Sequence, residues 1–160
     1  RPFVRGDYIV SPKAEGIVDT IGVIYTILLT PDNKRISIPN GALANDVITN
    51  VTANDIRRID IQVGVSYNTD IRKAKKLIKE AFDENGLVVK NKEIIIYVSD
   101  LASSAVILGG RAWCKTEDYW TARWGIIEEI KVKFDKSGIE IPYDQLEVHI
   151  NESKNSKNNV

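Results

Sequence analysis

Residues 59–83 have the sequence IDIQVGVSYNTDIRKAKKLIKEAFD, which places a strand pattern directly before a helix pattern. In its first part, apolar side chains occupy every second position: Ile59, Ile61, Val63 and Val65. Such alternation is typical of a strand that is buried on one face. The second part places six apolar residues at helical spacing: Ile71, Ala74, Leu77, Ile78, Ala81 and Phe82. We expect an amphipathic helix over 69–83, capped by Asn68 or Thr69 and ended near Gly86.

The sequence that follows predicts two more strands, at 93–98 and 106–114, and a second helix over 118–136. Acidic residues at the start of this helix favour its dipole, and Gly138 supplies its stop. Within the strand at 106–114, Gly109 and Gly110 predict a bulge. A last strand is expected at 146–150. The order strand, helix, strand, strand, helix, strand is that of a ferredoxin-like layer of two helices on a sheet.

The segment before this layer has short β-branched runs separated by turn residues, which predicts a small all-β domain. We expect strands at 8–10, 16–30, 35–38 and 47–51, with Gly22 bending or splitting the second. Residues 31–33 form a turn, and Pro39-Asn40-Gly41 ends the third strand in a tight turn because Asn-Gly readily takes positive φ. The fold class is therefore α+β, with a β-domain preceding an α/β domain.

The composition excludes several kinds of protein. The 160 residues carry 22 Lys+Arg and 22 Asp+Glu, so net charge gives no reason to expect nucleic acid or an anionic membrane as partner. One cysteine and one histidine cannot form an internal disulfide or a Cys/His metal cluster, and we expect no metal and no cofactor. The longest uncharged apolar run, 20–30, is shorter than the roughly 20 residues of a spanning helix. We expect a soluble fragment of a longer protein, in a reducing cytoplasm.

Catalysis finds no support in the sequence. Cys114 and His149 lie on separate predicted strands, and no Gly-x-Ser-x-Gly motif is present. Cys114 is expected to be a small buried hydrophobe, and His149 to face solvent or a neighbouring chain. Arg111 alone does not make a phosphate cradle. We therefore expect no enzyme and no catalytic residue.

The second helix has more apolar surface than one core face needs. One stripe consists of Tyr119, Ala122, Ile126, Ile130 and Phe134. A second stripe beside it contains Trp120, Trp124 and Ile127. Either the two stripes form one broad core face, or Trp120 or Trp124 is buried against another subunit, where tryptophan is enriched.

Several segments together resemble the cytoplasmic part of the small-conductance mechanosensitive ion channel family, over Arg1 to about Ile150. The matching motifs are Arg1-Pro2-Phe3, Gly6-Asp7-Tyr8, Ile38-Pro39-Asn40-Gly41, Gly64-Val65-Ser66-Tyr67, Asp118-Tyr119-Trp120 and Gly138-Ile139-Glu140-Ile141-Pro142-Tyr143. Asp144 departs from the family, which commonly has a second proline there. The resemblance implies an Sm-like β-domain (1–56), a ferredoxin-like α/β domain (57–143) and a C-terminal barrel strand (144–151). The remaining tail (152–160) consists mostly of Asn, Ser and Lys with almost nothing to bury, and we expect it to be disordered.

The resemblance also implies a function. Such a protein opens under membrane tension and releases ions and small osmolytes in hypo-osmotic shock. It is a homoheptamer whose α/β domains enclose a vestibule with side portals, on the cytoplasmic side of a bacterial or archaeal inner membrane. The membrane helices are not part of this sequence.

Eight residues are carried over from the family as site residues. Arg1, Pro2 and Phe3 would lie beneath the pore helix, and the Asn40-Gly41 turn would touch the membrane region. Leu146, Val148 and Ile150 would form a barrel strand between subunits. Trp120 and Trp124 are placed at a subunit interface on the spacing of the second helix, not on the resemblance. From spacing alone, the strand at 146–150 could instead complete the chain's own sheet, and Asn40-Gly41 could be a turn and nothing more.

An independent nucleic-acid-binding module is the competing hypothesis, because Sm-like and ferredoxin-like folds both occur in RNA-binding proteins. RNA recognition through the sheet needs aromatic residues on its central strands. The strand at 59–65 has none, and the strand at 106–114 has only Trp113. The channel hypothesis is therefore preferred, with no nucleic-acid partner.

Overall fold

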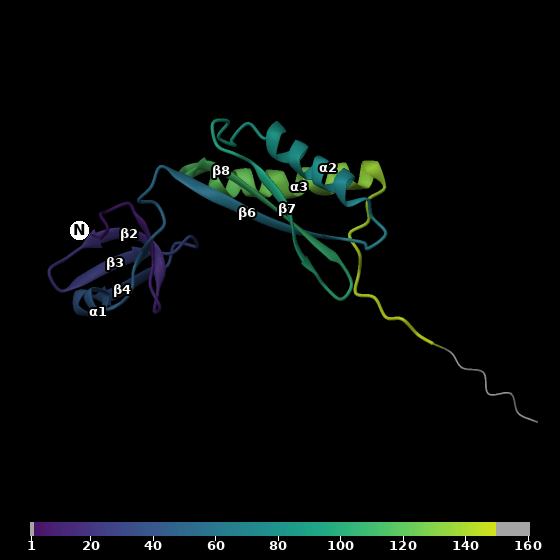
Figure 1. The fold of residues 1–160 in the computed structure, drawn as a ribbon. Coiled ribbons are helices and arrows are strands. Elements are labelled where there is room, and N and C mark those ends of the chain that lie inside the picture. The colour runs from purple at the N-terminus through teal and green to yellow at the C-terminus, as the bar shows by residue number, and fades with distance from the viewer. Residues whose placement is uncertain (1, 150–160) are drawn as a thin grey trace, which may run out of the picture.

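A computed structural model describes residues 2–149, in which two antiparallel sheets follow one another along the chain (Figure 1). The first sheet has the strand order β4-β3-β2-β1-β5. Its elements are β1 (Tyr8–Val10), β2 (Glu15–Ile21), β3 (Tyr25–Leu29), β4 (Arg35–Pro39), the short helix α1 (Asn40–Asn45) and β5 (Thr49–Asn50). One small apolar cluster fills it: Ile9, Val18, Leu28, Ile38 and Leu43.

Most of the strands predicted for the β-domain are confirmed. Gly22 splits the long second run into β2 and β3, and the turn after β3 holds Asn33 at a φ of 64°. The tight turn predicted at Asn40-Gly41 is wrong, because both residues open helix α1 and neither has a positive φ. Pro39 suits the position before a helix, because proline lacks a backbone N–H and the N–H groups at the start of a helix have no partner inside it.

The second sheet has the order β6-β8-β7, with both long helices on one face (Figure 1). Its elements are β6 (Ile56–Val65), α2 (Ile71–Glu84), β7 (Ile95–Leu101), β8 (Val106–Lys115), the 3-10 turn η1 (Thr116–Asp118) and α3 (Tyr119–Ser137). β6 and β8 pair along their full length, from Ile56 opposite Lys115 to Val65 opposite Val106. In β6, the alternating apolar side chains of residues 59–65 face the helices, as predicted.

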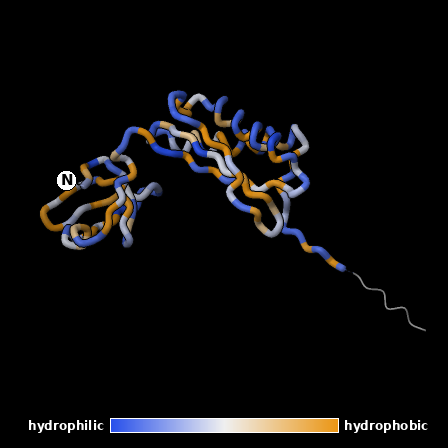
Figure 2. The backbone as a smooth tube through the Cα atoms, viewed as in Figure 1, coloured by the Kyte–Doolittle hydropathy of each residue, from blue (hydrophilic) through white to orange (hydrophobic). Residues whose placement is uncertain are grey.

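The ends of the helices follow local chemistry. Asp70 caps α2 by accepting hydrogen bonds from the backbone N–H groups of Arg72 and Lys73, so the predicted cap at Asn68 or Thr69 is wrong. Gly138 ends α3 as predicted, with a φ of 70° that favours glycine. Polar residues lie along the outer side of α2, away from the sheet (Figure 2).

The glycine pair in β8 is explained by packing, and the predicted bulge there is wrong. The register of β8 against β6 is continuous through Gly109 and Gly110, and the irregularity lies on β7, between Val98 and Asp100. A Cβ on Gly110 would lie 2.5 Å from the Phe82 ring, and one on Gly109 would lie 2.3 Å from Tyr97. Each face of the central strand therefore leaves room for one aromatic ring.

The segment after α3 forms no strand among the described residues. Residues 146–149 run away from the sheet and pair with none of its strands, so the alternative in which they complete the chain's own sheet is wrong (Figure 1). Arg1, Ile150 and the predicted tail at 152–160 lie outside the described residues.

Candidate functional site

Asn40 connects two parts of the β-domain through its side chain. Its Nδ2 group donates to the carbonyl oxygens of Gly22 (2.9 Å) and Val23 (3.0 Å), and its Oδ1 accepts from the Thr26 hydroxyl (2.8 Å). Its backbone N–H donates to the carbonyl of Ile24 (2.8 Å). Thr26 is only 1% exposed, so Asn40 satisfies a buried hydroxyl as well. Asn40 therefore fixes the β2–β3 turn against the start of α1.

The turn that Asn40 holds is apolar and exposed. Val23 is 98% exposed and Ile24 66% exposed, at a position where a free monomer gains nothing from apolar side chains. Beside the turn is an apolar hollow lined by Pro2, Phe3, Ile21, Thr26, Asn40 and Leu43. The structure thus brings together Pro2, Phe3 and Asn40, with Gly41 next in the chain, while Arg1 lies outside the described residues.

The exposed tryptophans form a second apolar surface. Trp120 and Trp124 are 54% and 62% exposed, and their ring centroids are 5.7 Å apart. They line a groove of about 820 Å³ with residues of the β-domain: Tyr8, Val10, Ile17 and Val51. The core face of α3 consists of Ala122, Ile126, Ile130 and Phe134. The single broad core face is therefore wrong, because the tryptophan stripe points away from the core.

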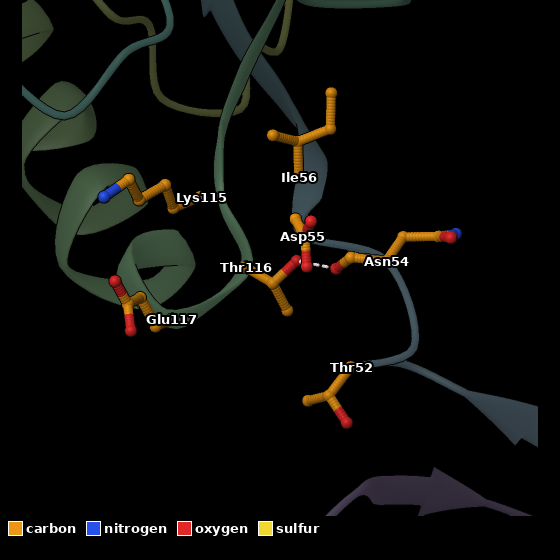
Figure 3. A pocket seen from close by; sticks show the side chains of 7 residues that line it. All are labelled: Thr52, Asn54, Asp55, Ile56, Lys115, Thr116 and Glu117. Atoms are coloured by element: carbon orange, nitrogen blue, oxygen red, sulfur yellow. Dashed lines mark hydrogen bonds between the residues drawn. The ribbon is translucent and has the colours of Figure 1, made fainter.

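A hydrogen-bonded clamp, which the sequence did not reveal, lies where the two sheets meet (Figure 3). The Thr116 hydroxyl donates to the carbonyl of Asn54, and the Thr116 N–H donates to the carbonyl of Asp55 (2.9 Å). The pocket here is also lined by Thr52, Lys115 and Glu117. Lys115 and Glu117 extend to the side of Thr116 away from Asn54, so the polar groups do not converge (Figure 3). The clamp fixes the connection and offers no catalytic arrangement.

The C-terminal segment is anchored at two points and then leaves the fold. The Ser66 N–H donates to the carbonyl of Glu140, and the Gln145 N–H donates to the Ser104 hydroxyl, both at 3.2 Å. Beyond the second anchor, Leu146 is 87% exposed and Val148 67% exposed. These two apolar side chains have no cover in the described chain.

The residues with the most reactive side chains are placed as the sequence predicted. Cys114 is buried, and burial raises the pKa of its thiol. His149 is exposed, with its Nε2 atom 3.5 Å from a Glu147 oxygen. Arg111 forms an ion pair with Asp60. No cluster of His, Cys, Asp and Glu side chains suited to a metal ion occurs in the described residues, and none of their helices is long and apolar enough to cross a membrane.

Comparisons with known proteins match both parts of the chain to domains of mechanosensitive ion channels. Residues 1–53 match the family model "Mechanosensitive ion channel, beta-domain", and residues 59–141 match "Mechanosensitive ion channel MscS, C-terminal". The chain belongs to the MscS family of mechanosensitive ion channels. The family consists of channels rather than enzymes, and the predicted family and α+β fold class are confirmed.

Relatives and solved structures agree with the family. The small-conductance mechanosensitive channel of Helicobacter pylori is 34% identical over 157 residues, which cover 98% of this chain and 57% of that protein. That of Edwardsiella ictaluri is 31% identical over 150 residues, 94% of this chain and 52% of that protein. The crystal structure of H. pylori MscS in its closed state matches with a TM-score of 0.89 at 34% identity, over 96% of this chain and 61% of that one. Arabidopsis thaliana MSL1 matches with a TM-score of 0.73 at 25% identity, over 90% of this chain and 54% of that one. The chain spans about half the length of the curated relatives.

Proposed function

We propose that this chain is the cytoplasmic part of a channel that opens under membrane tension and releases ions and small osmolytes in hypo-osmotic shock. The observation that carries the proposal is the match of both modules in order, with a TM-score of 0.89 to H. pylori MscS over 96% of the chain. On this proposal the membrane-spanning part belongs to the parent protein, in a bacterial or archaeal inner membrane. No step of this function requires a catalytic residue or a cofactor.

The chain is proposed to assemble as a homoheptamer, in a ring with side portals. Two exposed apolar surfaces support assembly, the Trp120 and Trp124 groove and the segment with Leu146 and Val148. Burying them in subunit contacts removes apolar area from water. Residues 146–150, with Ile150 as the last apolar position, would pair with the same segment of neighbouring copies. A closed barrel of such strands leaves no open edge.

The proposed coupling to the pore runs through the face that contains Arg1, Pro2, Phe3, Asn40 and Gly41. Asn40 supports this role because three side-chain hydrogen bonds hold the apolar β2–β3 turn in one position. A rigid apolar turn can transmit a displacement of the membrane part, which a mobile turn would absorb.

The full-length protein that contains this sequence provides the test. Patch-clamp recording from bacterial membranes without other mechanosensitive channels should show currents that open with applied suction, and the cells should survive hypo-osmotic shock. Asn40→Ala should change closure or inactivation. Lys34→Ala, which removes an exposed ion pair with Asp32 at the other end of β3, is the control and should leave both unchanged. Absence of tension-activated current in the correctly inserted wild-type protein would contradict the proposal.

A further inference from the structure

The sheet β6-β8-β7 has one face without a covering helix. Both α2 and α3 pack on the opposite face (Figure 1). Side chains on the open face come from alternate positions of the three strands: Arg58, Asp60 and Gln62 of β6, Tyr97 of β7, and Arg111 and Trp113 of β8. This open face therefore carries two cations, one carboxylate and two aromatic rings.

Asp60 holds the two arginines in place. Arg58 Nε donates to Asp60 Oδ2 at 3.1 Å, and Arg58 Nη2 lies at the same distance from that oxygen. Arg111 Nε lies 2.9 Å from Asp60 Oδ1. The backbone of Asp60 is itself fixed, because its carbonyl accepts a hydrogen bond from Arg123 of α3. The cluster is preorganised, which lowers the entropy cost of binding a ligand.

The cluster has more positive charge and more donors than it uses. Two guanidinium groups face one carboxylate, so one positive charge has no counter-charge within the cluster. The buried Nε of Arg111 makes no hydrogen bond despite its short contact, since that contact is poorly aligned. The terminal nitrogens of Arg111 make no hydrogen bond within residues 2–149. Its side chain is 43% exposed, so these donors are accessible. A planar guanidinium with free terminal N–H groups matches carboxylate and phosphate oxygens.

Aromatic rings flank the arginines. Trp113 is directly opposite Arg58 in the β6–β8 ladder, and the Tyr97 ring lies over Gly109, with the Arg111 guanidinium 5.0 Å from its centroid. A pocket of about 400 Å³ extends from Arg58 and Trp113 toward the connection between the two sheets. Its lining also includes Thr49, Val51, Asn54 and Asp60. Lys92, 5.3 Å from the Trp113 ring, adds another cation. A flat ring can stack on Trp113 while its anionic group reaches the arginines.

We propose that this open face binds a small organic anion in which a phosphate or carboxylate accompanies an aromatic ring, as in a nucleoside phosphate. Arg58 and Arg111 would hold the anionic group, and Trp113 would stack on the ring. The site goes beyond the proposed channel function and does not depend on it, because all its residues come from one copy of the chain.

Isothermal titration of the 160-residue chain with ADP, adenosine and inorganic phosphate tests the proposal. ADP should bind more tightly than either fragment, and Arg111→Gln or Arg58→Gln should weaken ADP binding about tenfold or more. Arg72→Gln, on the solvent side of α2, is the matched control and should change it less than twofold. Trp113→Leu should reduce ADP binding to the level of inorganic phosphate.

Three results would overturn the proposal: no ADP binding at millimolar concentration, equal loss in Arg72→Gln and Arg111→Gln, or phosphate binding as tightly as ADP. Arg111→Lys is a second variant in case Arg111→Gln does not fold. It keeps the charge and the aliphatic stem and should therefore fold. It should still weaken ADP binding, since lysine lacks the planar fork. Full ADP binding by a folded Arg111→Lys variant would contradict the role of the fork. Tension-activated current does not require ADP binding. The absence of ADP binding would therefore overturn this proposal and leave the proposed channel function standing.

Discussion

The two sheets of this protein differ in how much core each one has. The β-domain buries five apolar residues in one cluster, whereas the layer of β6, β7 and β8 with its helices buries seventeen. The β-domain also holds the most exposed apolar turn, at Val23 and Ile24. A sheet with a small core and exposed apolar side chains gains stability from neighbours. The α/β layer has the core of an independent folding unit, and the β-domain has that of a part completed by assembly.

The largest expected effect is in the α/β layer. Phe82→Ala removes a ring that is fully buried against Gly110, and should lower the free energy of unfolding of this layer by about 3 to 5 kcal/mol. Urea denaturation followed by helical circular dichroism measures the change. Phe82→Leu, which keeps most of the apolar contact, is the control and should lose clearly less. Equal losses in the two variants would show that the ring is not packed as described.

The next effect is in the β-domain. Leu28→Ala should cost about 2 to 5 kcal/mol, and it removes one of only five core residues. Because so little core remains, we expect the β-domain of the isolated chain to lose its hydrogen-exchange protection while α2 and α3 stay protected. Uniform loss of protection along the whole chain would mean that the two sheets fold as one unit.

Replacing the two exposed tryptophans should affect subunit association more than the stability of a single chain. Trp120→Ala with Trp124→Ala should change the free energy of unfolding of a single chain little, since both side chains are largely exposed. The same pair should weaken subunit association by about 2 kcal/mol or more, as buried tryptophans at interfaces do. Sedimentation velocity measures association, with Tyr143→Ala, which removes another exposed aromatic side chain, as the control. Unchanged association in the tryptophan variant would remove these residues from the proposed interface.

Asn40→Ala should cost about 1 to 3 kcal/mol, because it leaves the buried Thr26 hydroxyl without its partner. Hydrogen exchange at residues 22–26 should become faster, and thermal denaturation measures the loss of stability. The double variant Asn40→Ala with Thr26→Val removes both partners and should recover part of the loss. No recovery would indicate that the hydrogen bonds to Gly22 and Val23 provide most of the effect.

The smallest effect is expected at Lys133, which joins α2 to α3. Its Nζ atom lies 2.9 Å from Glu84, 3.7 Å from Glu129 and 4.0 Å from Glu80. The hydrogen bond to Glu84 raises the pKa of Lys133 above its ordinary value of 10.5. A raised folded-state pKa contributes stability that is fully present at neutral pH and is lost as the pH rises through that pKa.

Lys133→Met should therefore lower stability at pH 7, with a difference from wild type that shrinks above pH 10.5. Thermal denaturation across pH 7 to 11 measures this difference. Lys136→Met, at an exposed position on the same helix, is the control. A constant difference between Lys133→Met and wild type over the whole range would mean that Lys133 acts through packing of its stem.

The regular elements were predictable from the sequence because their signals are local. Alternation at 59–65, helical spacing at 71–82 and the stop at Gly138 each depend on residues close in the chain. Predictions failed where a distant partner decides the conformation. Asn40-Gly41 has the composition of a turn, yet hydrogen bonds to residues 22–26 hold Asn40 at the start of a helix. Local sequence predicts a bulge at Gly109 and Gly110, whereas aromatic rings from β7 and α2 require glycine at both positions.

The functional surfaces were only partly predictable. Spacing on α3 showed that the tryptophans form a second stripe, but not whether the core would include them. The Thr116 clamp and the Asp60 cluster join residues about 50 to 60 positions apart, and nothing in the local sequence marks them. Strand register decides which side chains share a face, and it becomes visible only in the fold.

Light scattering of residues 1–160 and of residues 1–144 over a concentration series tests whether the exposed apolar surfaces hold subunits together. We expect a particle of seven copies for the longer chain, which dissociates when the segment with Leu146, Val148 and Ile150 is removed. A monomer at every concentration for both chains would contradict the claim that these exposed apolar surfaces are assembly surfaces.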